Sequence, residues 1–248
     1  MRMRIPRGVL PVFVLLLGWE VLARSRLVPE YLFPPFSRVL ATAFDLVGSG
    51  ELGRDLLSSL IRVVAGFLLG ALSGMVMGIV MGWNEKVGRS FGPVFGLLYP
   101  IPALGWLPLL MIWVGIREAL PILIIGICSF FPVLYNTSTG IRSLNPRVVQ
   151  AARTLGASDL RILWKLAIPM AISHILTGLR LEAGMGWRVV IAAEMVAIPT
   201  GIGALLIKSE SLLRVDIIVV CLIVLSLMGL LFERLFAYLE ERMTRNWR

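Results

Sequence analysis

Four charged residues lie close together in a strongly apolar part of the chain. Arg180, Glu182, Arg188 and Glu194 fall in or beside the stretch 176–198, whose other residues are mostly hydrophobic. An ionised side chain in such surroundings is costly unless it has a partner or water. Neither glutamate is three or four residues from Arg188, so no neighbour on its own helix neutralises it. Arg188 therefore either pairs with a glutamate across helices or offers a positive point on the path of an anion, and the sequence leaves both interpretations open.

The other reactive side chains do not form a catalytic or metal-binding set. His174 is the single histidine, and no cysteine or carboxylate is near it in sequence. Cys128 and Cys221 lie in apolar stretches, where we expect them to pack. None of the three lysines follows a glycine, so the chain lacks a phosphate-binding P-loop. We expect no catalytic residue, no metal and no cofactor, with His174 at an interface rather than in a proton relay.

The composition places these residues in a membrane protein. The chain has 248 residues, of which 58% are hydrophobic and 16% charged, and its mean hydropathy is +0.87. A soluble domain is about half apolar with about a quarter of its residues charged. The net charge of +9 would suggest nucleic acid in a soluble chain. With this hydropathy we instead attribute it to cytoplasmic loops, and we expect no nucleic-acid partner.

The hydropathy pattern predicts an all-α polytopic protein. A membrane-spanning helix needs about 20 mostly apolar residues, and six stretches are candidates. They cover residues 9–23, 60–82, 91–114, 120–141, 176–198 and 217–237.

Basic residues orient the spans. With six spans and both termini in the cytoplasm, most Arg and Lys residues fall on the cytoplasmic side, as the positive-inside rule requires. Arg2, Arg4 and Arg7 precede the first apolar run and could also mark a cleavable signal peptide. We favour a retained helix, because Trp19 and Glu20 occupy the positions before the would-be cleavage site. The segment 24–59 is then external, with a short amphipathic helix at 39–47 on the outer surface.

The third predicted span is rich in proline. Pro93, Pro100, Pro102 and Pro108 each remove a helical hydrogen bond, so this span is expected to be kinked or interrupted. Freed carbonyl groups suit a helix that lines a path, although a kink that serves packing alone is the alternative. On the first interpretation Trp106 and Pro108, together with Arg188 and Glu194, line the path, and Trp113 lines it or lies at an interface.

The longest predicted cytoplasmic segment, 142–168, is expected to form two short helices. Asn145 followed by Pro146 is a typical helix start, and Gly156 stands where a left-handed cap would end the first helix. Ser158 can cap a second helix, and Pro169 marks its end or a kink.

One face of the first short helix is shallow and apolar. Val148, Ala151, Ala152 and Leu155 fall on it at helical spacing. Such a face either docks into a groove of another protein or packs on the protein's own spans.

This segment resembles the EAA loop of binding-protein-dependent ABC importer permeases. The resemblance rests on residues 150–157, Gln-Ala-Ala-Arg-Thr-Leu-Gly-Ala, and on 164–169, Trp-Lys-Leu-Ala-Ile-Pro. The family's first residue is Glu, and Gln150 keeps its size and hydrogen bonding but not its charge. The resemblance extends from about residue 31 to residue 247, and within the family this sequence is similar to the nitrate, sulfonate and taurine branch. The further motifs are Phe33-Pro34-Pro35, Ser59-Leu60-Ile61-Arg62-Val63, the run 100–108, Gly178-Leu179-Arg180 and Gly201-Ile202-Gly203.

The resemblance implies a type I ABC importer permease (MetI-like) fold in the bacterial cytoplasmic (inner) membrane. Residues 1–55 would form an N-terminal helix and external segment, 56–240 the transport core and 241–248 a cytoplasmic tail. A second permease copy would complete the path, two cytoplasmic ATPase subunits would bind ATP and Mg, and an external binding protein would deliver the substrate. The implied ATPase-coupling residues are Gln150, Ala151, Ala152, Leu155, Gly156 and Ala157.

Function follows as a hypothesis with open alternatives. ATP-driven closure of the partner subunits would pull the two EAA loops together and rock the spans from inward-open to outward-open. The solute would be small and anionic, such as a sulfonate, taurine or nitrate, although bicarbonate, aromatic acids and vitamin precursors also fit the branch. The alternative is an ion-coupled secondary transporter that uses Arg188, Glu182 and Glu194. An intramembrane enzyme is disfavoured, because the sequence holds no nucleophile–base pair.

Overall fold

The computed structural model describes residues 9–25 and 27–244, and every regular element in these ranges is helical. In chain order they are α1 (Val9–Arg24), α2 (Phe36–Gly48), α3 (Glu51–Trp83), α4 (Glu85–Leu98), η1 (Ala103–Trp106), α5 (Leu107–Val114), α6 (Ala119–Arg142), α7 (Pro146–Thr154), α8 (Asp159–Ile162), η2 (Leu163–Ala167), α9 (Ile168–Ala183), α10 (Met185–Ala197), α11 (Ile202–Ser211) and α12 (Val215–Thr244). Arg2, Arg4 and Arg7, on which the orientation partly rests, lie outside the described residues, as do 245–248 of the predicted tail.

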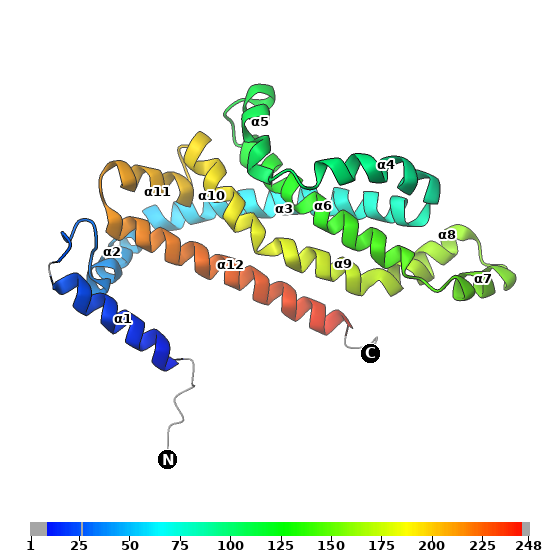
Figure 1. The fold of residues 1–248 in the computed structure, drawn as a ribbon, viewed down its shortest axis with the longest axis horizontal. Coiled ribbons are helices and arrows are strands. Elements are labelled where there is room, and N and C mark those ends of the chain that lie inside the picture. The colour runs from blue at the N-terminus through cyan, green and yellow to red at the C-terminus, as the bar shows by residue number, and fades with distance from the viewer. Residues whose placement is uncertain (1–8, 26, 245–248) are drawn as a thin grey trace, which may run out of the picture.

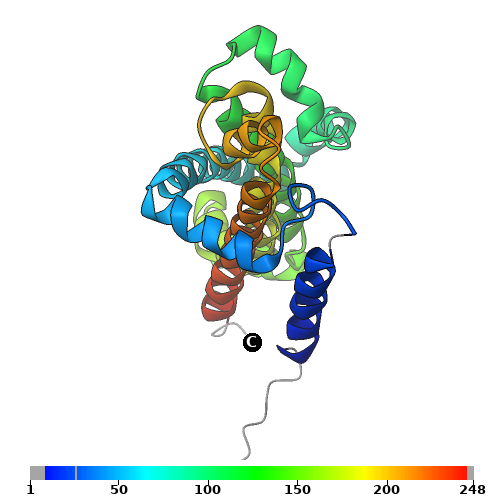
Figure 2. The ribbon, with the colours of Figure 1, turned by 90° about the vertical axis from the view of Figure 1, so that its left-hand side faces the viewer.

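Long helices run along the main axis of the molecule (Figure 1). Helices α3, α6, α9 and α12 share this direction, α2 and α11 lie at one end, and α7 and α8 lie at the other. Figure 2, which looks along the main axis, shows that α2 runs across this axis at the end of the molecule where α11 also lies, which we call the α2–α11 end. Helix α2 contains the predicted amphipathic stretch 39–47, with Val39, Thr42 and Leu46 buried and Leu40, Phe44 and Val47 exposed.

The described residues hold four or five of the six predicted spans. Four helices in them are long and apolar enough to cross a membrane, or five if the bent pair α4 and α5 counts as one span. Helix α1 has 16 residues in the described part of the chain, fewer than the roughly 20 of a span, and it begins at the edge of that part, so the first predicted span stays a prediction. The fifth predicted span begins earlier than expected, because helix continues from Asp159 to Val196. The second half of the predicted loop is therefore helical and continuous with this span. At 38 residues the helix is longer than the roughly 20 residues that a bilayer requires, so its first turns can lie outside the membrane.

Prolines shape two of these helical stretches as the sequence predicted. The chain bends by 88° between Leu98 and Ala103, where Pro100 and Pro102 stand in a non-helical link. Proline cannot donate the backbone hydrogen bond that would continue the helix. Near Pro169 the change is milder, because the five-residue π-helical turn η2 ends just before it and α9 continues beyond it.

A row of glycines packs α3 directly against α6. A Cβ atom added at Gly66 would lie 2.7 Å from the carbonyl oxygen of Ile122, and one added at Gly78 would lie 2.7 Å from that of Leu134. Such distances leave no room for a side chain. The row therefore lets the two backbones touch, as small residues do between membrane helices. Its members, spaced four residues apart, are Gly66, Gly70, Gly74, Gly78 and Gly82.

The main core lies where α3, α6, α10, α11 and α12 meet. Leu120, Ile124, Trp187 and Val190 are buried there together with Cys221. Cys221 and the half-buried Cys128 are free thiols, in agreement with their predicted packing role.

Adding one methyl group to the glycine row should destabilise the protein. At Gly70 the new Cβ would overlap the backbone of Gly126, so we expect Gly70→Ala to lower the free energy of unfolding by about 1 to 3 kcal/mol. Gly229→Ala is the control, because nothing lies within 4 Å of its added Cβ, and alanine favours helix over glycine by about 1 kcal/mol. Thermal unfolding of the detergent-solubilised protein measures both. Equal behaviour of the two variants would contradict the close packing.

Candidate functional site

The α7–α8 end forms the predicted pair of short helices. Asn145 caps α7, because its side-chain oxygen accepts a hydrogen bond of 2.9 Å from the N–H of Arg147. Gly156 ends the helix with φ of +80°, a conformation that favours glycine. Ser158 caps α8 by accepting from the N–H of Arg161 at 3.4 Å. These local predictions are confirmed.

The apolar face of this helix pair is not covered by the described part of the chain. Leu155 is 88% exposed, Leu160 69% and Trp164 65%. Val148 and Ala151 are also exposed, and Ala152 is partly exposed. The alternative in which this face packs on the protein's own spans is therefore wrong. We call Leu155, Leu160 and Trp164, together with the predicted coupling residues, the coupling surface.

The four charged residues of the fifth span do not pair with one another. Arg180 forms an ion pair of 3.1 Å with Glu240 of α12. Glu182 is buried, and its carboxylate lies 3.5 Å from the sulfur of Cys128. Glu194 pairs with a residue of α3, described below.

Arg188 is the exception among these four. Its guanidinium is exposed and lies 3.5 Å from the sulfur of Met185, and it contacts neither glutamate. Of the two interpretations that the sequence left open, the one in which Arg188 pairs with Glu182 or Glu194 is thus wrong. A spacing of six residues places them on different faces of a helix, and each glutamate turns inward toward another span.

The charge that organises the α2–α11 half is Arg62 of α3. Its side chain is only 3% exposed. Its Nη1 lies 2.6 Å from Oε1 of Glu194 and donates to the carbonyl oxygen of Thr200 at 2.7 Å. Its Nη2 donates to the Thr200 hydroxyl at 2.6 Å. Arg62 therefore joins α3 to the end of α10 and to the segment that leads into α11.

Glu118, which precedes α6, completes the pairing. Its two carboxylate oxygens accept from Nε and Nη2 of Arg62 at 2.7 and 2.8 Å, the bidentate geometry that suits arginine. Its side chain is 67% exposed, in contrast to that of Glu194. The hydrogen bonds from Arg62 hold the pKa of Glu118 below its usual range. Glu118 thus stays ionised at neutral pH, and its contribution to stability is lost only in acid, as the pH falls through this lowered pKa.

Glu194 is held on all sides. The hydroxyl of Ser59 donates to both of its oxygens at 2.8 Å, and the N–H of Gly203 donates at 2.9 Å. The latter N–H belongs to the first turn of α11, where the helix dipole favours a negative charge. A side chain at Gly201 would collide with the carboxylate. We call Arg62, Glu118, Glu194, Ser59 and Thr200 the Arg62 network.

The predicted path residues are not brought together in the single chain. Trp106 lines an apolar cavity of about 350 Å³ between α3, α4 and α6. Arg188 lines a separate cavity of about 260 Å³ between α9, α10 and α12. Pro108 lies in the first turn of α5, and Glu194 belongs to the Arg62 network. The sequence placed Arg62 only in the motif Ser59-Leu60-Ile61-Arg62-Val63 and predicted no role for it, although its charge, opposite to that of Glu194, was a usable signal.

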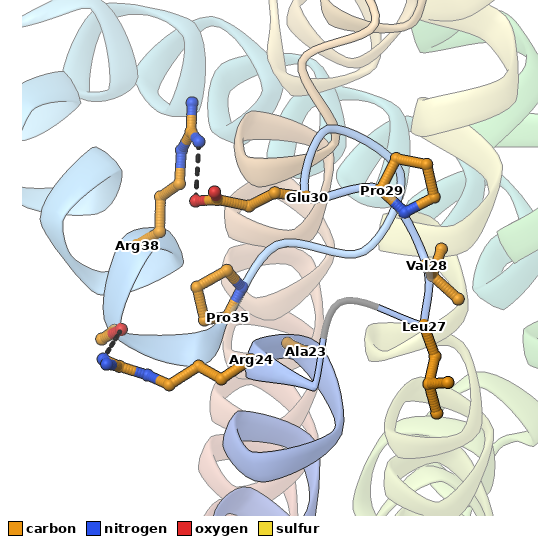
Figure 3. Close-up of a pocket in the computed structure, with 9 residues that line it drawn as sticks. Ala23, Arg24, Leu27, Val28, Pro29, Glu30, Pro35 and Arg38 are labelled. Atoms are coloured by element: carbon orange, nitrogen blue, oxygen red, sulfur yellow. Dashed lines mark hydrogen bonds and ion pairs between the residues drawn. The ribbon is translucent and has the colours of Figure 1, made fainter.

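A further cavity lies between the end of α1 and the start of α2, and Figure 3 shows it. Its volume is about 1080 Å³. Its charged side chains bind one another or nearby groups, as in the pair of 2.9 Å between Arg38 and Glu30 and the bond from Arg24 to Glu20. Exposed ion pairs of this kind contribute little to stability. We assign this cavity no function.

Comparison with known proteins shows the family of this chain. Residues 66–245 match the family model described as the binding-protein-dependent transport system inner membrane component. The chain belongs to this family. It is a multi-pass inner-membrane subunit of an ABC importer that works with a binding protein and a separate ATPase subunit. ATP is hydrolysed by that partner, and the permease itself carries no cofactor.

Curated relatives cover most of the permease. It is 37% identical to a putative ABC transporter permease of Methanocaldococcus jannaschii, over 90% of this chain and 81% of the relative. It is 33% identical to the taurine transport system permease of Escherichia coli over 93% and 86%. It is 30% identical to the nitrate import permease of a Synechocystis strain over 96% and 89%.

A solved structure shares the fold. The inward-facing MetNI methionine ABC transporter matches with a TM-score of 0.59 at 15% identity, over 76% of this chain and 95% of that chain. This likeness confirms the predicted permease fold.

The two carboxylates of the Arg62 network should differ in their effect on stability. We expect Glu194→Gln to lower the free energy of unfolding by about 3 to 5 kcal/mol, because it removes one partner of a buried ion pair. We expect Glu118→Gln to cost about 1 kcal/mol or less, because its side chain is largely hydrated. Denaturation of the purified protein at pH 7 compares them. Similar losses would contradict the difference in burial.

Proposed function

We propose that this permease subunit moves a small organic or inorganic anion across the membrane and takes its energy from the ATPase through the coupling surface. The single observation that carries the proposal is the exposure of Leu155, Leu160 and Trp164 at the α7–α8 end. Large apolar side chains gathered on a helical tip that should face the aqueous cytoplasm favour a protein partner.

The shape of this end supports docking of a compact helix into a cleft. The small residues Ala151, Ala152 and Ala157 keep the helix pair slim, while Leu155 stands beside the Gly156 turn. Gln150 is exposed on α7 and offers an amide rather than a charge. Contact at this position would therefore use hydrogen bonds rather than an ion pair.

Orientation and oligomeric state follow in the same proposal. The α7–α8 end faces the cytoplasm with both termini, because this end carries basic residues such as Arg147, Arg153 and Arg161. A second copy of the permease completes the path. Helix α5 supports this arrangement, because it stands away from the body and leaves Ile112 and Trp113 largely exposed.

An anionic substrate is favoured by Arg188. It is exposed, has no ion pair among the described residues and lines a cavity within the second half of a membrane-crossing stretch. A cation placed there is costly unless water or an anion accompanies it. The relatives named for taurine and nitrate fit the same sign of charge. The ion-coupled alternative is disfavoured, because its three residues, Arg188, Glu182 and Glu194, lie in separate surroundings.

A charge on the coupling surface should prevent assembly with the ATPase. We expect Leu155→Glu to lower co-purification of the ATPase subunit at least about tenfold, since loss of a central apolar contact costs about 2 kcal/mol. Leu212→Glu is the matched control, because Leu212 is 64% exposed at the opposite end of the molecule. Assembly of the Leu155 variant at the control level would refute this docking surface.

The role of Arg188 is tested by uptake kinetics in liposomes that hold the complete transporter. With labelled taurine as probe, Arg188→Gln should raise KM about tenfold, because a charge-assisted hydrogen bond is worth about 1.5 to 3 kcal/mol. Arg188→Lys should recover part of the loss. Arg89→Gln, which alters only an exposed pair with Glu85, is the control. If taurine is not carried, nitrate replaces it. An unchanged KM for the carried anion would remove Arg188 from the path.

A further inference from the structure

Helix α5 is an arm joined to the body at two bends. On one side is the 88° break after α4, with Pro100 and Pro102. On the other is Gly115, whose φ of +80° favours glycine, followed by the short link to α6. Figure 1 shows α5 standing out from the long helices. Leu110 of α5 packs into the main core, whereas Ile112 and Trp113 are exposed. An element with two bends and one exposed side can move as a unit more easily than a helix that is packed on all sides.

The base of this arm is tied to the body through Glu118. Glu118 stands three residues after Gly115 and makes both of its described hydrogen bonds with Arg62. Arg62 in turn holds Glu194 of α10 and Thr200. The guanidinium of Arg62 thus links α3 to the base of the α5 arm and to the segment between α10 and α11.

The two carboxylates on Arg62 differ in how easily they can leave. Glu194 has a fully buried side chain and further donors in Ser59 and Gly203. Its departure would strand a charge in the interior, which is strongly unfavourable. Glu118 is 67% exposed, so its carboxylate would enter water at once. Arg62 would meanwhile keep Glu194 and both oxygens of Thr200.

We propose that the contact between Arg62 and Glu118 is a releasable latch that positions the α5 arm, while the contact between Arg62 and Glu194 is permanent. The latch lies toward the α2–α11 end, opposite the coupling surface, and it is closed in this structure. It rests on the proposed function in one respect: ATP binding at the far end must open this end, and the latch then breaks. Glu118 is a positioning residue and does not touch the substrate.

State-dependent cross-linking of the complete transporter tests the latch. Cysteines at positions 118 and 200, made by Glu118→Cys and Thr200→Cys, replace two side chains that share one nitrogen of Arg62. A short thiol-reactive cross-linker is applied without nucleotide and after trapping with ATP and vanadate. We expect the cross-linked fraction to fall about fivefold or more on trapping, as a shift from a mostly closed to a mostly open population requires.

A second cysteine pair serves as the control. Glu51→Cys and Lys208→Cys replace an exposed ion pair of 2.9 Å that joins α3 to α11 in the same half of the molecule. Neither element belongs to the arm, so this yield should stay constant. The chain with only Cys128 and Cys221 gives the background.

The outcomes separate the latch from the proposed function. Equal yields at positions 118 and 200 in both states, in a complex whose ATP hydrolysis vanadate blocks, would overturn the latch alone. A fall in the cross-linked fraction of both pairs would show that this whole half of the molecule loosens, and it would also overturn the latch. Failure of the wild-type permease to assemble with the ATPase would instead refute the proposed function. To recognise a folding defect, both cysteine pairs are placed in one protein and cross-linked with reagents that can be cleaved separately. Loss of the cross-link between positions 51 and 208 then indicates misfolding.

Discussion

The burial of Arg62 is the constraint on which much of this structure depends. A guanidinium buried between helices must be neutralised and hydrogen-bonded by the protein, because only 3% of this side chain is exposed to solvent. The permease meets this need with groups from three other segments: Glu118, Glu194 and Thr200. The need to pair this guanidinium therefore holds the start of α6, the end of α10 and the segment before α11 close to Arg62. Small residues at 201 and 203 follow from the same crowding.

The two functional ends are connected by helices that cannot slide easily. The glycine row of α3 brings its backbone into contact with α6 over most of their length, so that displacement of one helix displaces the other. The coupling surface lies at one end of this unit and the Arg62 network toward the other. In the transport cycle we propose, a push at the coupling surface is carried as a rigid-body movement, and it is expressed at the α5 arm, which two bends join to the body.

Electrostatics divides the intramembrane charges into two kinds. The guanidinium of Arg62 is fully paired with its partners and has a structural role, and Arg180 is paired with Glu240. Arg188 has no ion pair among the described residues and borders a cavity, so it alone of these three can offer its charge to a passing anion. This division fits the anionic substrate that we propose.

The sequence by itself determined the local features. Asn145, Gly156 and Ser158 shape the coupling loop through their own backbone preferences, prolines interrupt the third predicted span, and composition requires a membrane, because each of these effects acts within a few residues or on the chain as a whole. The tertiary structure alone decided the ion pairs between helices, the contact of the glycine row with α6 and the exposure of the coupling surface. Arg62 and Glu194 are 132 residues apart, and whether they meet depends on which faces of α3 and α10 are packed together. Arg188, for which the sequence left pairing open, faces outward for the same reason: a helix directs residues six positions apart to different neighbours.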